Sequence, residues 1–211
     1  MDPRNSPCQV GIATRDMRVY YRLVQEFKRN GAPFRSILPD EEIPSDVKVV
    51  ITTNEERPLI DSKRIITVGP GYPYRLAVDR ALHSPAERDT FNEVVVGIDP
   101  GKSIGVATLG DGRIIHTALL RGAAKLRREL NYVFWAFPSS RRLIRIGSIG
   151  SRPILNAITE SLGGLRWDAP MELVDERRTS QQLSHSEVDL PRDILSAIQI
   201  ASRLGKRLGV N

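Results

Sequence analysis

The stretch that most constrains the fold lies near the middle of the chain, at residues 94–109. An apolar run, Val94–Ile98, ends in a single carboxylate, Asp99, and a Pro-Gly turn and a second apolar run follow. The pattern predicts two adjacent strands with an acid at the end of the first. A carboxylate there is costly unless it binds something, so Asp99 predicts a ligand, with a divalent cation as the first candidate. The alternative is an Asp-Pro-Gly turn in an ordinary hairpin.

The turn after Asp99 has a composition that suits an anion. The glycines at positions 101 and 105 predict a tight turn and close approach of a phosphate or sugar. Lys102 and the N–H groups of the turn predict a phosphate contact, although the spacing of a Walker A motif is missing. Sugar kinases and actin-like ATPases also begin with an Asp-Gly turn after a strand, so a nucleotide phosphotransferase is an alternative function.

The distribution of charge favours a polyanionic partner. The 211-residue chain has a formal net charge of +6. Residues 1–90 hold 14 Lys and Arg against 13 Asp and Glu, whereas residues 91–211 hold 17 against 12. The excess therefore lies in the half that contains Asp99, and a basic field attracts nucleic acid. The alternative is a charged surface of the thermophile type.

The cysteine content and the hydropathy of the chain indicate the cellular compartment in which we expect the protein. The single cysteine, Cys8, excludes an internal disulfide and a multi-cysteine zinc site. No apolar run approaches the roughly 20 residues of a membrane span, and the first residues lack the apolar core of a signal peptide. We therefore expect a cytoplasmic protein with no membrane partner.

The first part of the chain alternates short β-type and helical patterns. This alternation predicts a small parallel sheet, and hence a Rossmann-like or flavodoxin-like α/β domain at residues 1–88. A polar segment at residues 84–92 predicts the boundary to the second domain. The expected strands are residues 10–13, 33–38, 47–52 and 64–68, and the expected helices are residues 17–29 and 74–82.

The second domain, residues 89–211, begins with three strands in quick succession. Asp111-Gly112 is a strong hairpin turn signal between the second and third. The whole order is β-β-β-α-β-α-β-α, which predicts a mixed sheet. The expected strands are residues 94–99, 104–109, 113–118, 142–147 and 171–175, and the expected helices are residues 122–137, 153–162 and 191–208.

This order, with an acid closing the first strand, resembles the ribonuclease H-like fold. Gly97–Gly101 with Gly105-Val106-Ala107 resembles the opening of the RuvC Holliday-junction resolvases and their YqgF (RuvX) relatives. Val174–Ser180 is similar to the Asp-Glu-Arg-Leu-(Ser/Thr)-Thr motif of the YqgF branch, and Asp193–Ala197 to the final helix of the family, which begins with an acid. The resemblance covers residues 94–208.

The resemblance implies a hydrolase, a metal-dependent endonuclease that cuts a structured DNA or RNA, either resolvase-like or RNA-processing. Two-metal phosphodiester cleavage needs carboxylates that converge on ions about 4 Å apart. The implied catalytic and metal ligands are Asp99, Glu176 and Asp193, which would bind Mg²⁺ or Mn²⁺. Asp175 and Asp189 are further candidate ligands. Because neighbouring residues on a regular strand face opposite sides, Asp175 and Glu176 cannot both face the site, and the resemblance favours Glu176.

Each of these groups of acidic residues also has an alternative role that involves no metal. Asp193 would also favour the dipole of its helix, and residues 175–178 would also suit a solvated run of paired charges. Resolvases proper carry a Glu at the end of the fourth strand, whereas this chain has Arg145-Ile146-Gly147. The difference favours a YqgF-like arrangement, and it supports an alternative function, a catalytically weak nucleic-acid-binding protein.

Basic residues near aromatic ones predict the nucleic-acid-binding surface. The helix at residues 122–137 also contains Tyr132, Phe134 and Trp135, and such a combination suits a phosphate backbone and an unstacked base. The alternative places the aromatics in the core and the charges in solvent. Family relatives are often dimers, so the resemblance adds a homodimer as an expected assembly. The candidate nucleic-acid-binding residues are Lys102, Lys125, Arg127, Arg128, Arg141, Arg142 and Arg177.

Overall fold

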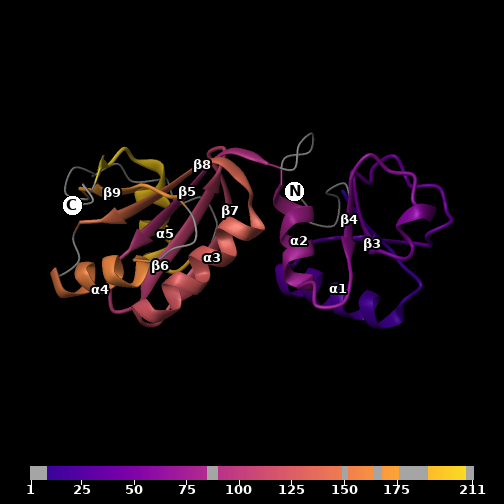
Figure 1. Ribbon diagram of the computed structural model, residues 1–211, viewed down its shortest axis with the longest axis horizontal. Coiled ribbons are helices and arrows are strands. Elements are labelled where there is room, and N and C mark those ends of the chain that lie inside the picture. The colour runs from indigo at the N-terminus through magenta and orange to yellow at the C-terminus, as the bar shows by residue number, and fades with distance from the viewer. Residues whose placement is uncertain (1–8, 85–89, 149–151, 164–167, 176–189, 208–211) are drawn as a thin grey trace. The chain divides into compact units, whose positions relative to one another are not determined.

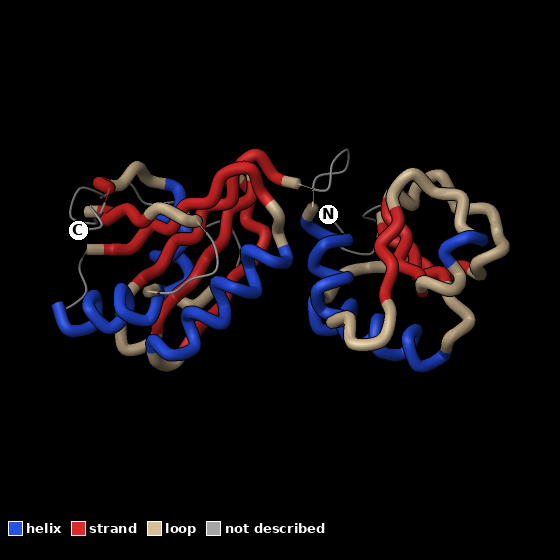
Figure 2. The backbone as a smooth tube through the Cα atoms, viewed as in Figure 1, coloured by secondary structure: helices blue, strands red, loops and turns tan. Residues whose placement is uncertain are grey.

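The computed structural model describes residues 9–84, 90–148, 152–163, 168–175 and 190–207 (Figures 1 and 2). The chain divides into two compact units, Met1–Arg88 and Asp89–Asn211. Each unit has its own sheet and its own apolar core. Within the described ranges, every helix is too short or too polar to cross a membrane.

The N-terminal unit contains a four-stranded sheet in the order β2-β1-β3-β4, with all pairs parallel. This is the flavodoxin-like order, so the predicted small parallel α/β unit is confirmed. The strands are β1 (Val10–Ala13), β2 (Arg35–Ile37), β3 (Val49–Thr53) and β4 (Ile65–Val68), and the helices are α1 (Met17–Asn30), the 3₁₀ helix η2 (Arg57–Leu59) and α2 (Tyr74–His83).

Helix α1 begins and ends at the residues that local chemistry favours. The side chain of Asp16 accepts the N–H groups of Arg18 and Val19, which are otherwise unbonded at a helix start. Gly31 follows the helix with φ of 60°, a left-handed conformation that suits glycine. Buried Leu23 and Phe27 share one apolar core with α2 and with β1, β3 and β4, so both helices cover the same face of the sheet.

A carboxylate joins the carboxyl ends of β1 and β3. Glu56 accepts hydrogen bonds from the hydroxyl of Thr14 at 2.5 Å, the N–H of Arg15 at 2.7 Å and the hydroxyl of Thr53 at 2.9 Å. Partial burial raises the pKa of Glu56, but these three donors stabilise the anion more, and the pKa lies below its ordinary value of 4.5. The bonds connect two strand ends that are distant in sequence.

Replacing Glu56 should therefore loosen the N-terminal unit. We expect Glu56→Gln to lower the free energy of unfolding by about 1 kcal/mol, because the carboxylate is only partly buried. Because the carboxyl pKa is lower in the folded state, ionised Glu56 stabilises the fold at pH values above the unfolded-state pKa of about 4.5. This stabilisation is lost as the pH falls through the folded-state pKa. Urea unfolding of both proteins between pH 7 and pH 3 measures this. If the two proteins differed in free energy of unfolding by the same amount at every pH in this range, ionisation of Glu56 would not contribute to stability.

The C-terminal unit contains a six-stranded sheet in the order β10-β9-β8-β5-β6-β7. Strands β5, β6 and β7 are antiparallel neighbours, whereas β8 and β9 run parallel to β5. This mixed strand order is that of the ribonuclease H-like fold, so the predicted fold class is confirmed. The strands are β5 (Phe91–Asp99), β6 (Ile104–Gly110), β7 (Arg113–Leu120), β8 (Ser139–Gly147), β9 (Met171–Val174) and β10 (Lys206–Arg207).

The helices of this unit lie on both faces of the sheet (Figure 1). Ala107 of β6 packs against α5, and the next residue, Thr108, points to the other face. His116 pairs with Thr108 in register and contacts Glu129 of α3 at 2.6 Å, so α3 and α5 cover opposite faces. The helices are the 3₁₀ helix η3 (Ala123–Lys125), α3 (Leu126–Ala136), α4 (Arg152–Leu162) and α5 (Arg192–Ser202).

Several element boundaries differ from the prediction. The strand expected at residues 94–99 begins at Phe91, and the helix expected at residues 122–137 is divided into η3 and α3. The strand expected at residues 142–147 begins at Ser139, since its first residues pair with β5. The last helix was expected to reach residue 208, but α5 ends at Ser202 and the chain then forms β10 against β9. Gly205 makes this return possible, because a Cβ there would lie 2.7 Å from the Cβ of Glu172.

Candidate functional site

The two predicted acids that the structure describes lie at one edge of the C-terminal sheet. Asp99 ends β5 and is in register with Gly105 of β6. The first turn of α5 lies directly over Gly105, where an added Cβ would be 2.1 Å from the carbonyl oxygen of Asp193. The fold therefore brings Asp193 beside Asp99, although 93 residues of chain separate them.

Glycine makes this approach possible. An added Cβ at Gly97 would lie 2.2 Å from the carbonyl oxygen of Ala197, and one at Gly105 would meet Asp193 equally closely. Both positions face the backbone of α5, which therefore lies close to β5 and β6 at these two points. The space at Gly105 thus serves the helix, and the expectation that it admits a phosphate or sugar is corrected.

The electrostatics of the site centre on Asp99, whose side chain is half-buried. Burial raises the pKa of this carboxyl above its ordinary value of 3.8, and the charge of Asp193 raises it further. A hydrogen bond from the hydroxyl of Ser196 and the charge of Arg192 oppose the rise without cancelling it. Asp99 and Asp193 are thus a repelling pair of carboxylates in a partly desolvated position.

Such a pair suits a hard divalent cation. Mg²⁺ takes oxygen ligands and is usually held by one or two carboxylates, with water and substrate phosphate completing its shell. Asp99 and Asp193 supply that minimum, and a cation between them would remove the repulsion. The described part of the chain contains no group of three or more His, Cys, Asp or Glu side chains that could hold a metal.

Three of the predicted site residues, Glu176, Arg177 and Asp189, lie outside the described residues. Asp175 is described and exposed, directly after β9. Within β9, Glu172 faces the α5 side, where it accepts a hydrogen bond from Arg145 at 3.0 Å. The same guanidinium donates to the carbonyl oxygen of Ala201 at 2.6 Å, which fixes the end of α5 opposite Asp193.

Sequence reasoning missed Ser196, Arg192 and Arg145. Ser196 lies three residues after Asp193 on one helix, a spacing that places both on neighbouring positions of one face, so a signal was present. Arg192 is adjacent to Asp193 in the sequence and was equally visible. Arg145 had no signal, because its role depends on Glu172 and Ala201, which only the sheet and helix packing bring to it.

Part of the predicted basic surface lies at the same edge as Asp99. Lys102 is exposed in the turn between β5 and β6. Leu119 of β7 is in register with Gly105, and β7 is followed by two exposed cations, Arg121 and Lys125. Arg127 and Arg128 are exposed on the first turn of α3. These exposed cations therefore lie toward the same edge of the sheet as Asp99, with Lys102 in the turn that follows it.

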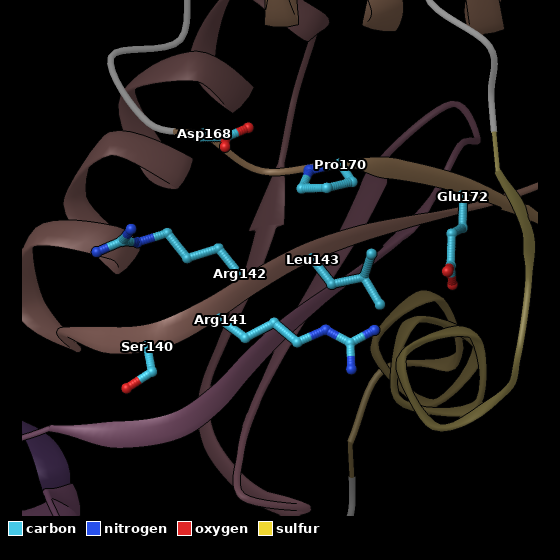
Figure 3. A pocket seen from close by; sticks show the side chains of 7 residues that line it. All are labelled: Ser140, Arg141, Arg142, Leu143, Asp168, Pro170 and Glu172. Atoms are coloured by element: carbon cyan, nitrogen blue, oxygen red, sulfur yellow. The ribbon is translucent and has the colours of Figure 1, made fainter.

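Arg141 and Arg142 lie elsewhere. They are at the beginning of β8, whose far end lies beside the end of β5 that carries Asp99. There they line a cavity of about 380 Å³ and extend in opposite directions from the strand (Figure 3). Arg141 also contacts Glu93 at 3.2 Å. The structure therefore does not gather these two residues with Lys102. The cavity is lined by Ser140, Arg141, Arg142, Leu143, Asp168, Pro170 and Glu172.

The aromatic residues of α3 separate into two groups. Phe134 is buried at 1% exposure and belongs to the core, which agrees with the alternative given for it. Trp135, the next residue, is 42% exposed. Of these two rings, the exposed one is therefore that of Trp135.

Parts of the chain are similar to known proteins. Residues 9–84 match the family described as a response regulator receiver-like domain. No curated protein matches the chain. Among solved structures, T. thermophilus RuvC in complex with a Holliday junction substrate shares 15% identity over 55% of this chain and 99% of that one, with a TM-score of 0.39. The structure of Aa-Ago with externally bound siRNA shares 9% identity over 83% of this chain and 36% of that one, with a TM-score of 0.31.

Both TM-scores are low, so the assignment of the C-terminal fold rests on its strand order. The N-terminal unit, whose residues 9–84 match the receiver-like model, has a parallel sheet in the order β2-β1-β3-β4. The C-terminal unit is ribonuclease H-like. Neither finding specifies a reaction.

Proposed function

We propose that the C-terminal unit is a metal-dependent endonuclease that cuts structured nucleic acid, and that residues 1–88 and 89–211 are separate domains. The observation that supports this activity is the pairing of Asp99 with Asp193 at the end of the central strand. A partly desolvated pair of carboxylates has little use in an ordinary fold, because it repels itself. Exposed cations at the same edge suit the phosphates of a substrate.

In this proposal Asp99 and Asp193 hold Mg²⁺ or Mn²⁺, and Glu176 completes the ligand set by its resemblance to the YqgF motif. The bound metal would supply an activated water and stabilise the leaving oxygen. Ser196 orients the carboxylate of Asp99 through its hydrogen bond. Arg145 holds the other end of α5 and thereby the position of Asp193. Lys102, which is exposed in the turn after Asp99, contacts the phosphates of the substrate.

The test is cleavage of a panel that includes a four-way DNA junction, a structured RNA and single strands, with Mg²⁺, Mn²⁺ or excess chelator. We expect cleavage that requires metal. We also expect the cleavage rate to depend on the structure of the substrate and to differ little between sequences of the same structure. Absence of cleavage with both metals across the panel would overturn the proposal.

A second candidate is a nucleic-acid-binding protein without an efficient site. Strand β8 ends in Arg145-Ile146-Gly147, so this strand brings no acid to the site at the position where resolvases carry one. Binding without cleavage in the same panel would favour this candidate.

The basic half should dominate affinity for nucleic acid. Residues 91–211 carry a net charge of +5 and residues 1–90 only +1. We expect a fragment of residues 91–211 to bind with a steep salt dependence, because binding releases condensed counterions, and a fragment of residues 1–90 to bind far more weakly. Binding of each fragment titrated with NaCl measures this. If the N-terminal fragment showed the salt-sensitive binding, the charge argument would be wrong.

A further inference from the structure

The outward face of α3 carries a stripe that the metal site does not use. Arg127, Asn131 and Trp135 follow at intervals of four residues, so they lie along one row of the helix. Arg128 lies beside this row. The helix packs on the sheet and also contacts α4. Its buried residues are Leu126, Leu130, Val133, Phe134 and Ala136.

The cations and the indole of the stripe are accessible, whereas Asn131 in the same row is partly buried. Arg127 and Arg128 are exposed, and Trp135 is 42% exposed. A single exposed apolar residue needs no explanation, but an indole in one row with a guanidinium has a specific chemistry. The ring offers a surface for stacking and the cations attract phosphate.

The helix adds no acid that would neutralise the stripe. The one acidic residue of α3, Glu129, lies on the flank toward β7. Its carboxylate contacts Nε2 of His116 at 2.6 Å, and both side chains are largely buried, at 16% and 11% exposure. The positive charge of Arg127 and Arg128 is therefore directed outward, which complements a polyanion.

We infer that this stripe binds an unpaired segment of nucleic acid, with a base stacked on Trp135 and phosphates at Arg127 and Arg128. In a duplex the base faces are covered by neighbouring bases, so an indole can stack only on an unpaired base or an end. The row from Arg127 to Trp135 is about 12 Å long, enough for a short run of nucleotides. The inference rests on the proposed function for the class of ligand, and it narrows the substrate to one with a single-stranded part.

The experiment measures binding of the full chain to a short oligo-dT and to a duplex of the same length, by fluorescence anisotropy at fixed salt. We expect Trp135→Ala to weaken oligo-dT binding roughly tenfold and duplex binding less than about twofold. Trp135→Phe should restore most of the oligo-dT affinity, because phenylalanine also stacks. The double variant Arg127→Gln with Arg128→Gln should bind both the oligo-dT and the duplex more weakly. It should also lower the slope of log affinity against log salt concentration by about two.

Matched controls come from the other unit. Tyr21 is an exposed aromatic on α1, at 61% exposure, and Arg18 and Arg22 are exposed on the same helix. Tyr21→Ala and the pair Arg18→Gln and Arg22→Gln should leave oligo-dT binding unchanged. Equal losses in these variants would overturn the inference.

Three further results would overturn it: unchanged oligo-dT affinity in Trp135→Ala, no rescue by Trp135→Phe, or no binding of oligo-dT by the unaltered protein. The outcome is separable from that of the nuclease proposal. Selective loss of oligo-dT binding in a protein that cuts nothing would support the stripe without the nuclease. Metal-dependent cleavage with unchanged binding in Trp135→Ala would support the nuclease without the stripe.

Discussion

Asp99→Asn should abolish cleavage while binding of nucleic acid stays the same or becomes tighter. The substitution removes a metal ligand at the end of β5 and one negative charge near the substrate phosphates. Because the metal contributes several kcal/mol of transition-state stabilisation, we expect the cleavage rate to fall at least about 100-fold. Rates under single-turnover conditions and binding measured in chelator separate the two effects. Full activity in this variant would end the proposed mechanism.

The same variant should be more stable than the unaltered protein in the absence of metal. The folded-state pKa of Asp99 is raised by burial and by Asp193. Because the carboxyl pKa is higher in the folded state, the fold loses stability as the pH rises through that value. At pH 7 the charge on Asp99 therefore lowers the free energy of unfolding. Asparagine removes this penalty. Asp168→Asn is the matched control, because Asp168 is an exposed carboxylate at the cavity of Figure 3; it should change neither cleavage nor stability.

Gly105→Ala should destabilise the C-terminal unit strongly. A methyl group at this position would lie 2.1 Å from the carbonyl oxygen of Asp193, and backbone cannot move away as a flexible side chain can. We expect a loss of about 3 kcal/mol, the upper part of the range for overpacking, and a fall of roughly 10 °C in the midpoint of thermal unfolding. Both tryptophans, Trp135 and Trp167, belong to this unit, so their fluorescence follows its unfolding.

Gly112→Ala is the control for the loss of a glycine. Gly112 has φ of 81° and open space around its Cβ position, so alanine there should cost only about 1 kcal/mol of backbone strain. Gly97→Ala should behave like Gly105→Ala, since its methyl would lie 2.2 Å from the carbonyl oxygen of Ala197. Equal midpoints for Gly105→Ala and Gly112→Ala would contradict close packing of α5 on the sheet.

The sequence by itself determined the elements and their order. The apolar run before Asp99 is a strand because β-type residues succeed one another there, and α1 begins at Asp16 and ends at Gly31 because capping acts within a few residues. The β-β-β-α-β-α-β-α order of elements then indicated a mixed sheet, although not the additional strand β10. The charge of the second half was also readable, because net charge is a sum that needs no coordinates.

Only the tertiary structure decided which of the candidate residues meet. Asp193 reaches Asp99 because two glycines let α5 lie on β5 and β6, and Ser196 comes with it. Arg142 follows α3 closely in the sequence but lies at the other end of β8 from the acids, because a strand carries its first and last residues far apart. Trp135 and Phe134 are neighbours in sequence, yet one is exposed and the other buried. Local pattern specifies what a segment becomes, whereas contacts between distant segments depend on how closely their backbones can approach.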